Sequence, residues 1–153
     1  MDDLIRVLEP DAIARLRSAY NPEQLRQANA RAFAETYAPI APWAESVASV
    51  FFRQGPLAAP ERELCLITLL AHRAPGLSLS NHVYWALMEG VNVAQICEAI
   101  GLAGCYGGLP TFTNGVLVLR TTLEVLQRVA NEHERDSRAV LAALVREFAK
   151  VTL

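Results

Sequence analysis

Residues 61–90 read ERELCLITLLAHRAPGLSLSNHVYWALMEG and contain two helical patterns. Apolar side chains recur every three or four residues on both sides of Pro75-Gly76, which is the spacing of helices with a buried face. The pattern predicts one helix from about 60 to 74 and a second from about 79 to 89. Because consecutive helices joined by a short link normally pack antiparallel, this stretch favours an all-α fold with antiparallel helix packing.

Glu63 is a polar residue on the apolar face of the first predicted helix. The residues three, four and seven positions later are Leu66, Ile67 and Leu70, so the Glu63 side chain is expected to point towards the edge of the core. A carboxylate in that place must be hydrogen-bonded or neutral, because an unpaired buried charge is strongly destabilising. The simpler interpretation is an acidic residue in the first turn that interacts with the helix dipole.

His82 interrupts the apolar face of the second predicted helix. Trp85 and Ala86 follow it one turn later and would leave a walled pocket beside the imidazole. Antiparallel packing would place His82 and Glu63 at opposite ends of their helices, so contact between them requires a subunit boundary or a longer link. Considered alone, a histidine of this kind is more often a hydrogen-bonded structural residue than a catalyst.

The rest of the chain also has helical periodicity and almost no strand signal. No repeat of 20–50 residues is visible, so a solenoid is not expected. The shorter and more polar helices near the start indicate an N-terminal helical extension, residues 1–54, packed on a helical core of residues 55–153 in a single domain. Further helices are predicted at residues 12–20, 22–36, 42–53, 93–105, 111–130 and 136–150. Gly90 is the predicted stop of the helix at 79–89, Asn92 the predicted cap of the helix at 93–105, and Asn114-Gly115 a weak point near the start of the helix at 111–130.

The composition excludes several classes of protein. The chain has 153 residues, a net charge of −2 and no basic stripe, so nucleic acid is not an expected partner. Its mean hydropathy is +0.20, yet no apolar run reaches the ~18 residues of a membrane span. Apolar surface buried between subunits would explain this hydropathy, so a homo-oligomer is expected.

The three cysteines give little sign of a disulfide framework or a metal site. Cys65, Cys97 and Cys105 are widely spaced and each is flanked by apolar residues, and neither CxxC nor HExxH occurs. They are interpreted as buried thiols in a reducing cytoplasm. The acidic N-terminus lacks the basic segment and apolar run of a secretory signal, which agrees with a cytoplasmic protein.

An ordered set of short motifs spans about residues 55–119, and the similarity weakens towards residue 128. In this order it resembles the carboxymuconolactone decarboxylase family of the AhpD-like superfamily. The resemblance implies an AhpD-like helical domain that assembles into trimers or hexamers. The matching residues are Glu63, His82, Ala86-Leu87, Gly90, Ile96-Cys97-Glu98 and Tyr106-Gly107-Gly108-Leu109-Pro110.

The same resemblance distinguishes between two kinds of chemistry. The redox branch of the superfamily carries a CxxC between the Glu and the His, and this chain has Pro75 and Ser78 at those positions. Neither residue can form the mixed disulfide that thiol exchange requires. The resemblance therefore implies the decarboxylase branch, which acts on a small carboxylated unsaturated lactone and needs no cofactor and no metal.

The resemblance also implies roles for individual residues. His82 would act as general acid and base and Glu63 as its partner. The bulky aromatic residues nearby would also suit an aromatic or polyketide-like substrate. Two other functions stay open: a thiol-dependent peroxidase or reductase, which the missing CxxC disfavours, and a ligand-binding module without catalysis. The predicted substrate pocket contains Ser78, Tyr84, Trp85 and Tyr106, and the arginines considered for a substrate carboxylate are Arg62, Arg73 and Arg120.

Overall fold

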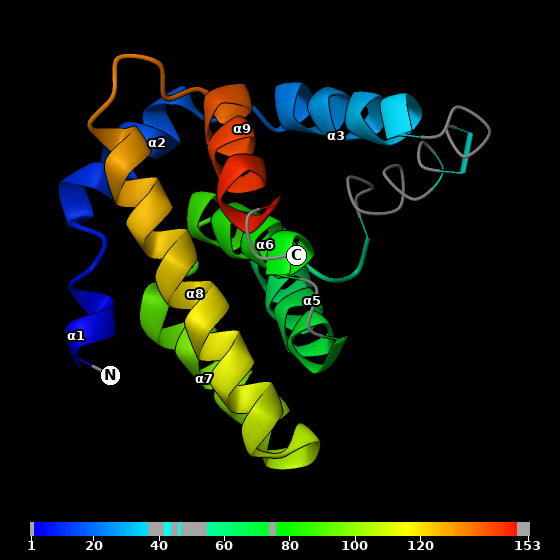
Figure 1. The fold of residues 1–153 in the computed structure, drawn as a ribbon, viewed down its shortest axis with the longest axis vertical. Helices are drawn as coiled ribbons and strands as arrows, with labels where there is room; N and C mark the ends of the chain where they lie inside the picture. Colours follow the sequence, from blue (N-terminus) through cyan, green and yellow to red (C-terminus); the bar gives the residue numbers. More distant parts are fainter. Residues whose placement is uncertain (1, 37–41, 44–45, 47–54, 74–75, 150–153) are drawn as a thin grey trace.

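The computed structural model describes residues 2–36, 42–43, 46, 55–73 and 76–149. Within these ranges the regular structure is helical and contains no strand, which confirms the all-α prediction. The predicted helix 42–53 lies mostly outside the described residues. The elements are α1 (Asp2–Ile5), α2 (Pro10–Ala19), α3 (Pro22–Thr36), α5 (Ala59–Arg73), α6 (Gly76–Met88), α7 (Val93–Gly107), α8 (Leu109–Ala130) and α9 (Ser137–Phe148) (Figure 1).

Helices α5, α6, α7 and α8 form the centre of the molecule. Helix α5 packs on α6 and α7, and α8 packs on α6, α7 and α9. Figure 1 shows α7 and α8 side by side, with α3 extending sideways beyond α9. Helix α1 contacts α7, and α2 contacts α8. Helix α3 packs mainly on α9, so it lies at the edge of the molecule.

Helix α6 is buried almost all round. Its residues Leu79 and Ser80 are buried, as is every residue from 82 to 88. A helix with apolar residues on every side is stable only inside a core, which explains why other helices surround α6. It begins at Gly76, three residues earlier than the sequence pattern predicts, because the turn that follows Pro75 is already helical.

The end of α6 is fixed by backbone hydrogen bonds and by α2. Gly90 has a φ of 101°, a left-handed conformation that glycine adopts without strain, as the predicted stop required. The Val91 N–H donates to the Ala86 carbonyl at 2.9 Å, which closes the last turn. The Arg17 guanidinium donates two hydrogen bonds, of 2.8 and 2.7 Å, to the Leu87 carbonyl. The C-terminus of α6 is therefore held both by its own backbone hydrogen bonds and by Arg17 of α2.

Helices α7 and α8 approach closely where glycines face larger side chains. A Cβ on Gly115 would lie 2.7 Å from Ile100 Cγ2, and a Cβ on Gly104 would lie 2.7 Å from Phe112 Cβ. Gly115, expected to weaken the start of the long helix, instead lies inside α8 and permits this contact. At the start of α7, the predicted cap is confirmed, because the Asn92 side chain accepts a hydrogen bond from the Gln95 N–H at 2.9 Å.

The N-terminal helices share the core of the later ones. Leu8, Ala12, Leu16 and Leu25 are buried in the same hydrophobic cluster as the residues of α6 and α8. The division at residue 54 stays a prediction. None of the described helices combines the length and the apolar character that crossing a membrane would require.

Candidate functional site

Glu63 and His82 are in direct contact inside the core. His82 Nδ1 lies 2.7 Å from Glu63 Oε2, and the two residues are only 8% and 5% exposed. The prediction that Glu63 points into the core is confirmed. Its place there follows from helical phase, since Glu63, Ile67 and Ala71 are the buried positions of α5.

The contact forms within one chain and needs no second subunit. Antiparallel packing was expected to hold the two residues at opposite ends, and that expectation is wrong. Glu63 lies ten residues before the end of α5 at Arg73, and His82 lies six residues after the start of α6 at Gly76. At 1.5 Å per residue these positions are roughly 15 and 9 Å from the link, a difference of about one helical turn, so the two side chains can meet although Glu63 lies in the second turn of α5.

The hydrogen bond orients the imidazole of His82. A carboxylate only accepts hydrogen bonds, so Nδ1 is the donor and its proton points at Glu63. Nε2 is the nitrogen that Glu63 does not bind, and imidazole nitrogens exchange protons near neutral pH. A histidine oriented in this way by a carboxylate has the arrangement of a general acid and base.

Trp85 and Ser78 lie on the same face of α6 as His82. The Trp85 indole is edge-on to the imidazole, with ring centroids 4.8 Å apart and an interplanar angle of 74°. Trp85 is buried and provides an apolar wall. Ser78, one turn before His82, is exposed. The face therefore leads from solvent at Ser78 to the interior at Trp85, with the imidazole between them.

Tyr20 and Glu89 form a neighbouring pair that the sequence did not suggest. The Tyr20 hydroxyl donates to Glu89 Oε1 at 3.2 Å. Burial raises the pKa of Tyr20 far above its ordinary value, and the charges of Glu89 and, more weakly, Glu63 raise it further. The only available signal was that Glu89 stands seven positions after His82, on the same helical face.

The other two predicted pocket residues lie elsewhere. Tyr84 is buried; its hydroxyl is 3.4 Å from Ser137 Oγ, and its ring is edge-on to Tyr20 at 6.0 Å. Burial raises the pKa of Tyr84 to about 12, although the Ser137 hydrogen bond lowers it slightly. Tyr106 is 91% exposed at the end of α7, so it is not buried with the Glu63–His82 pair.

The arginines considered for a substrate carboxylate are not gathered at this pair. Arg73 is exposed at the end of α5, and Arg120 is exposed on α8, where it binds Glu124 at 3.1 Å. Arg62 is half-buried beside Glu63 in the sequence, but the next residue of a helix points in a different direction. A carboxylate-binding arginine is therefore not identified among these three.

The cysteines require one correction. Cys97 is buried, and burial raises the pKa of its thiol. Cys65 and Cys105 are exposed, so the prediction that all three are buried is wrong. Apolar neighbours in sequence were a poor guide, because Cys65 stands two positions from Glu63 and therefore on the opposite side of α5. The described residues contain no group of three or more His, Cys, Asp or Glu side chains that could hold a metal ion.

A cavity of about 720 Å³ lies between α3 and α9 and is lined by residues of those helices and by Asn21. None of its lining residues belongs to α5 or α6, so this cavity is separate from the buried pair.

No protein-family model matches the chain, and comparisons with curated proteins and with solved structures give no match either. The resemblance to the carboxymuconolactone decarboxylase family therefore rests on its motif residues.

Proposed function

We propose that this chain is a carboxymuconolactone decarboxylase-like enzyme that transfers a proton, with or without decarboxylation, on a small carboxylated metabolite. The substrate is lactone-like, aromatic or polyketide-like, and the reaction uses no cofactor. The observation that supports this most strongly is the buried 2.7 Å hydrogen bond between His82 Nδ1 and Glu63 Oε2. In this proposal His82 is the general acid and base, and Glu63 orients it.

The chemistry of decarboxylation needs only the parts that these residues supply. The bond between the carboxylate carbon and the ring breaks, carbon dioxide leaves, and the electron pair moves into the conjugated carbonyl as an enolate. In its imidazolium form, with a proton on each nitrogen, His82 then delivers the Nε2 proton to the ring carbon, and the resulting neutral ring, still protonated on Nδ1, recovers a proton from water. The Nδ1–H bond to Glu63 stabilises the imidazole in the orientation that this transfer requires.

The surroundings of the pair favour this reaction over simple hydrolysis. Trp85 covers one side of the imidazole with an apolar ring, at a centroid distance of 4.8 Å. An apolar wall limits the access of water to an enolate that is waiting for its proton. Substrate would approach from the side of Ser78, which is the exposed end of this face.

The proposal includes assembly into a homo-oligomer, a trimer or hexamer, in the cytoplasm. The turn between α7 and α8 exposes large apolar residues, including Tyr106 and Leu109, and Leu117 is also exposed. Such residues are typical of surfaces that subunits cover. Tyr106, being exposed, would contribute to a pocket through contact with a neighbouring subunit. Cys65 and Cys105, as exposed free thiols, suit a reducing compartment.

The experiment that tests this function follows carbon protonation. Unsaturated lactone carboxylates and aromatic carboxylic acids are incubated with the protein in deuterium oxide, and deuterium on carbon is detected by proton NMR. His82→Ala is expected to lower the rate by roughly 10²–10⁴-fold. Glu63→Gln is expected to lower it less, because the histidine remains.

Controls make this experiment decisive. His133→Ala removes an exposed histidine from the loop before α9 and should keep the full rate. His82→Gln provides a second variant if the alanine variant does not fold. A folded His82 variant with the wild-type rate would exclude the proposal. Alkylation of the exposed Cys65 and Cys105 should leave the rate unchanged, whereas loss of activity would favour the thiol-dependent alternative.

A ligand-binding module without catalysis is the second candidate. The observation that favours it is the position of the α3–α9 cavity, which contains neither Glu63 nor His82. In that case the buried pair would serve only to hold α5 against α6, and neither variant would affect ligand binding.

A further inference from the structure

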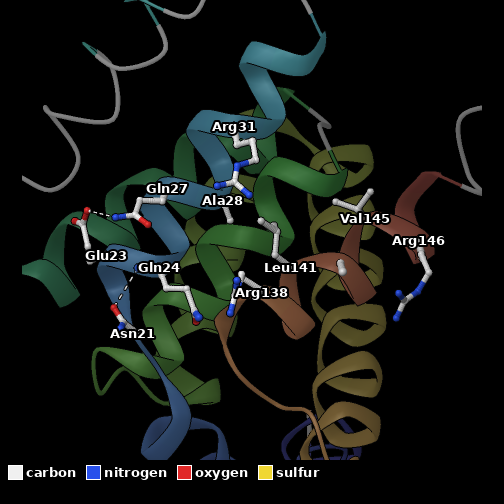
Figure 2. Close-up of a pocket in the computed structure, with 11 residues that line it drawn as sticks. Asn21, Glu23, Gln24, Gln27, Ala28, Arg31, Arg138, Leu141, Val145 and Arg146 are labelled. Atoms are coloured by element: carbon white, nitrogen blue, oxygen red, sulfur yellow. Dashed lines mark hydrogen bonds between the residues drawn. The ribbon is translucent and has the colours of Figure 1, made fainter.

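The groove between α3 and α9 has the dimensions and composition of a ligand site. Its volume is about 720 Å³, within the roughly 300–1,000 Å³ that is typical of small-molecule sites. Polar residues of α3 face α9 across the groove, and Leu141 and Val145 contribute apolar surface from α9 (Figure 2). The site therefore combines an apolar wall with polar groups at defined places.

The charged residues of the groove are mostly cationic. Arg31, Arg138 and Arg146 line it, and Glu23 is the acidic residue among its lining side chains. The Glu23 carboxylate is already bound by Arg26 at 2.8 Å and by Gln27 at 2.9 Å. These hydrogen bonds lower the pKa of Glu23 to about 2. The Glu23 carboxylate is therefore already paired within α3 and does not neutralise the arginines of the groove. The groove is cationic, whereas the whole chain has a net negative charge.

Two of the arginines are directed at the groove. Figure 2 shows the Arg31 and Arg138 side chains pointing towards the space between the helices, whereas Arg146 projects away from it. Among the described residues, Arg31 has no ion-pair partner, and Arg138 has only the Asp136 carboxylate at 3.7 Å. That distance is too long for a hydrogen bond. Both guanidinium groups can thus form new hydrogen bonds with an anion.

We propose that the α3–α9 groove binds a small amphiphilic carboxylate. Its carboxylate contacts Arg31 and Arg138, and its apolar body packs on Leu141 and Val145. This site goes beyond the proposed enzymatic function, because it shares no residue with the Glu63–His82 pair. Charge complementarity favours a free carboxylate over a neutral ligand of the same shape.

Isothermal titration calorimetry with 3-hydroxydecanoate tests the proposal. The acid should bind, its methyl ester should bind at least about tenfold more weakly, and acetate should show no measurable binding. Equal binding of acid and ester would overturn the proposal, because the arginines would then have no role.

Variants locate the binding. Arg31→Gln and Arg138→Gln should each weaken the affinity for 3-hydroxydecanoate about tenfold, with an unchanged helical signal in circular dichroism. Arg120→Gln removes an exposed arginine of α8 and should leave the affinity unchanged. Equal weakening by all three would show nonspecific charge attraction and overturn the proposal. If Arg138→Gln instead changes the molar mass in light scattering without changing the affinity, the groove is a subunit interface and the proposal is wrong.

Discussion

Ionisable residues are placed differently in two regions of the molecule, the core around α5 and α6 and the edge formed by α3 and α9. In the core, the ionisable groups of Glu63 and His82 are buried and bound to each other at 2.7 Å. At the edge, Arg31 and Arg138 are exposed and face an open groove. This difference indicates where a substitution can change function without also changing the stability of the fold. A change in the core alters packing as well as chemistry, whereas a change at the edge can remove one interaction and leave the fold intact.

The largest difference in unfolding free energy between core and surface substitutions is expected when leucine is replaced by alanine. Leu87 on α6 is 0% exposed and Leu102 on α7 is 55% exposed. Leu87→Ala should lower the free energy of unfolding by about 2–5 kcal/mol, since it leaves a cavity. Leu102→Ala should change it by no more than about 0.5 kcal/mol. Urea denaturation measures both values, and equal losses would show that α6 is not the buried centre of the fold.

Two glycines in helices extend the comparison to backbone packing. A Cβ on Gly115 would lie 2.7 Å from Ile100 Cγ2, whereas a Cβ on Gly101 would meet no atom within 4 Å. Gly115→Ala should lower the free energy of unfolding by about 1–3 kcal/mol, because α7 and α8 would have to separate. Gly101→Ala should raise it by about 0.5–1 kcal/mol through helix propensity. Thermal unfolding of the two variants gives the signs, and stabilisation by both would contradict the close helix contact.

The smallest effect is expected at the edge, where Asp136 caps α9. Its carboxylate accepts a hydrogen bond from the Ala139 N–H at 2.9 Å, and this bond is the main reason why its pKa lies below the ordinary 3.8. Asp136→Ala should cost about 1 kcal/mol of unfolding free energy at pH 7. Because the folded pKa is depressed, the stabilisation by the charge is complete above the unfolded pKa and is lost as the pH falls through the folded value.

The pH dependence distinguishes the charge of Asp136 from its capping geometry. Asp136→Asn keeps an oxygen acceptor for the Ala139 N–H but carries no charge. The wild type should therefore exceed the asparagine variant in stability at neutral pH, and the gap should narrow below pH 3.8. A gap that stays constant down to acid pH would contradict the role of the carboxylate charge.

The sequence predicted most helices because their signals are local. Asn92 as a cap and Gly90 as a stop depend on residues a few positions away, and both were confirmed. Glu63 and His82 were identified as polar residues on apolar faces, which periodicity alone reveals. Helix packing predicted that the two residues lie apart, and only the family resemblance implied that they are partners, because their contact depends on where two helices cross. A periodic pattern gives the face of a helix but not its crossing point.

The features that were missed depend on tertiary contacts. Tyr20 meets Glu89 only because α2 lies against α6, and the α3–α9 groove exists only because two helices far apart in sequence face each other. The exposure of Cys65 and Cys105 was missed for another reason. The identity of adjacent residues was considered, whereas the helical phase decides which side of a helix faces solvent.

The central claim is that Glu63 holds His82 with the proton on Nδ1 and leaves Nε2 for proton transfer. Long-range nitrogen–proton NMR of histidine-labelled protein tests it most directly, because it distinguishes the two imidazole nitrogens. The account predicts a proton on Nδ1 of His82 in the wild type and a changed Nδ1 signal in Glu63→Gln, with His133 unaffected. A wild-type His82 with Nδ1 unprotonated, or a spectrum that Glu63→Gln leaves unchanged, would contradict it.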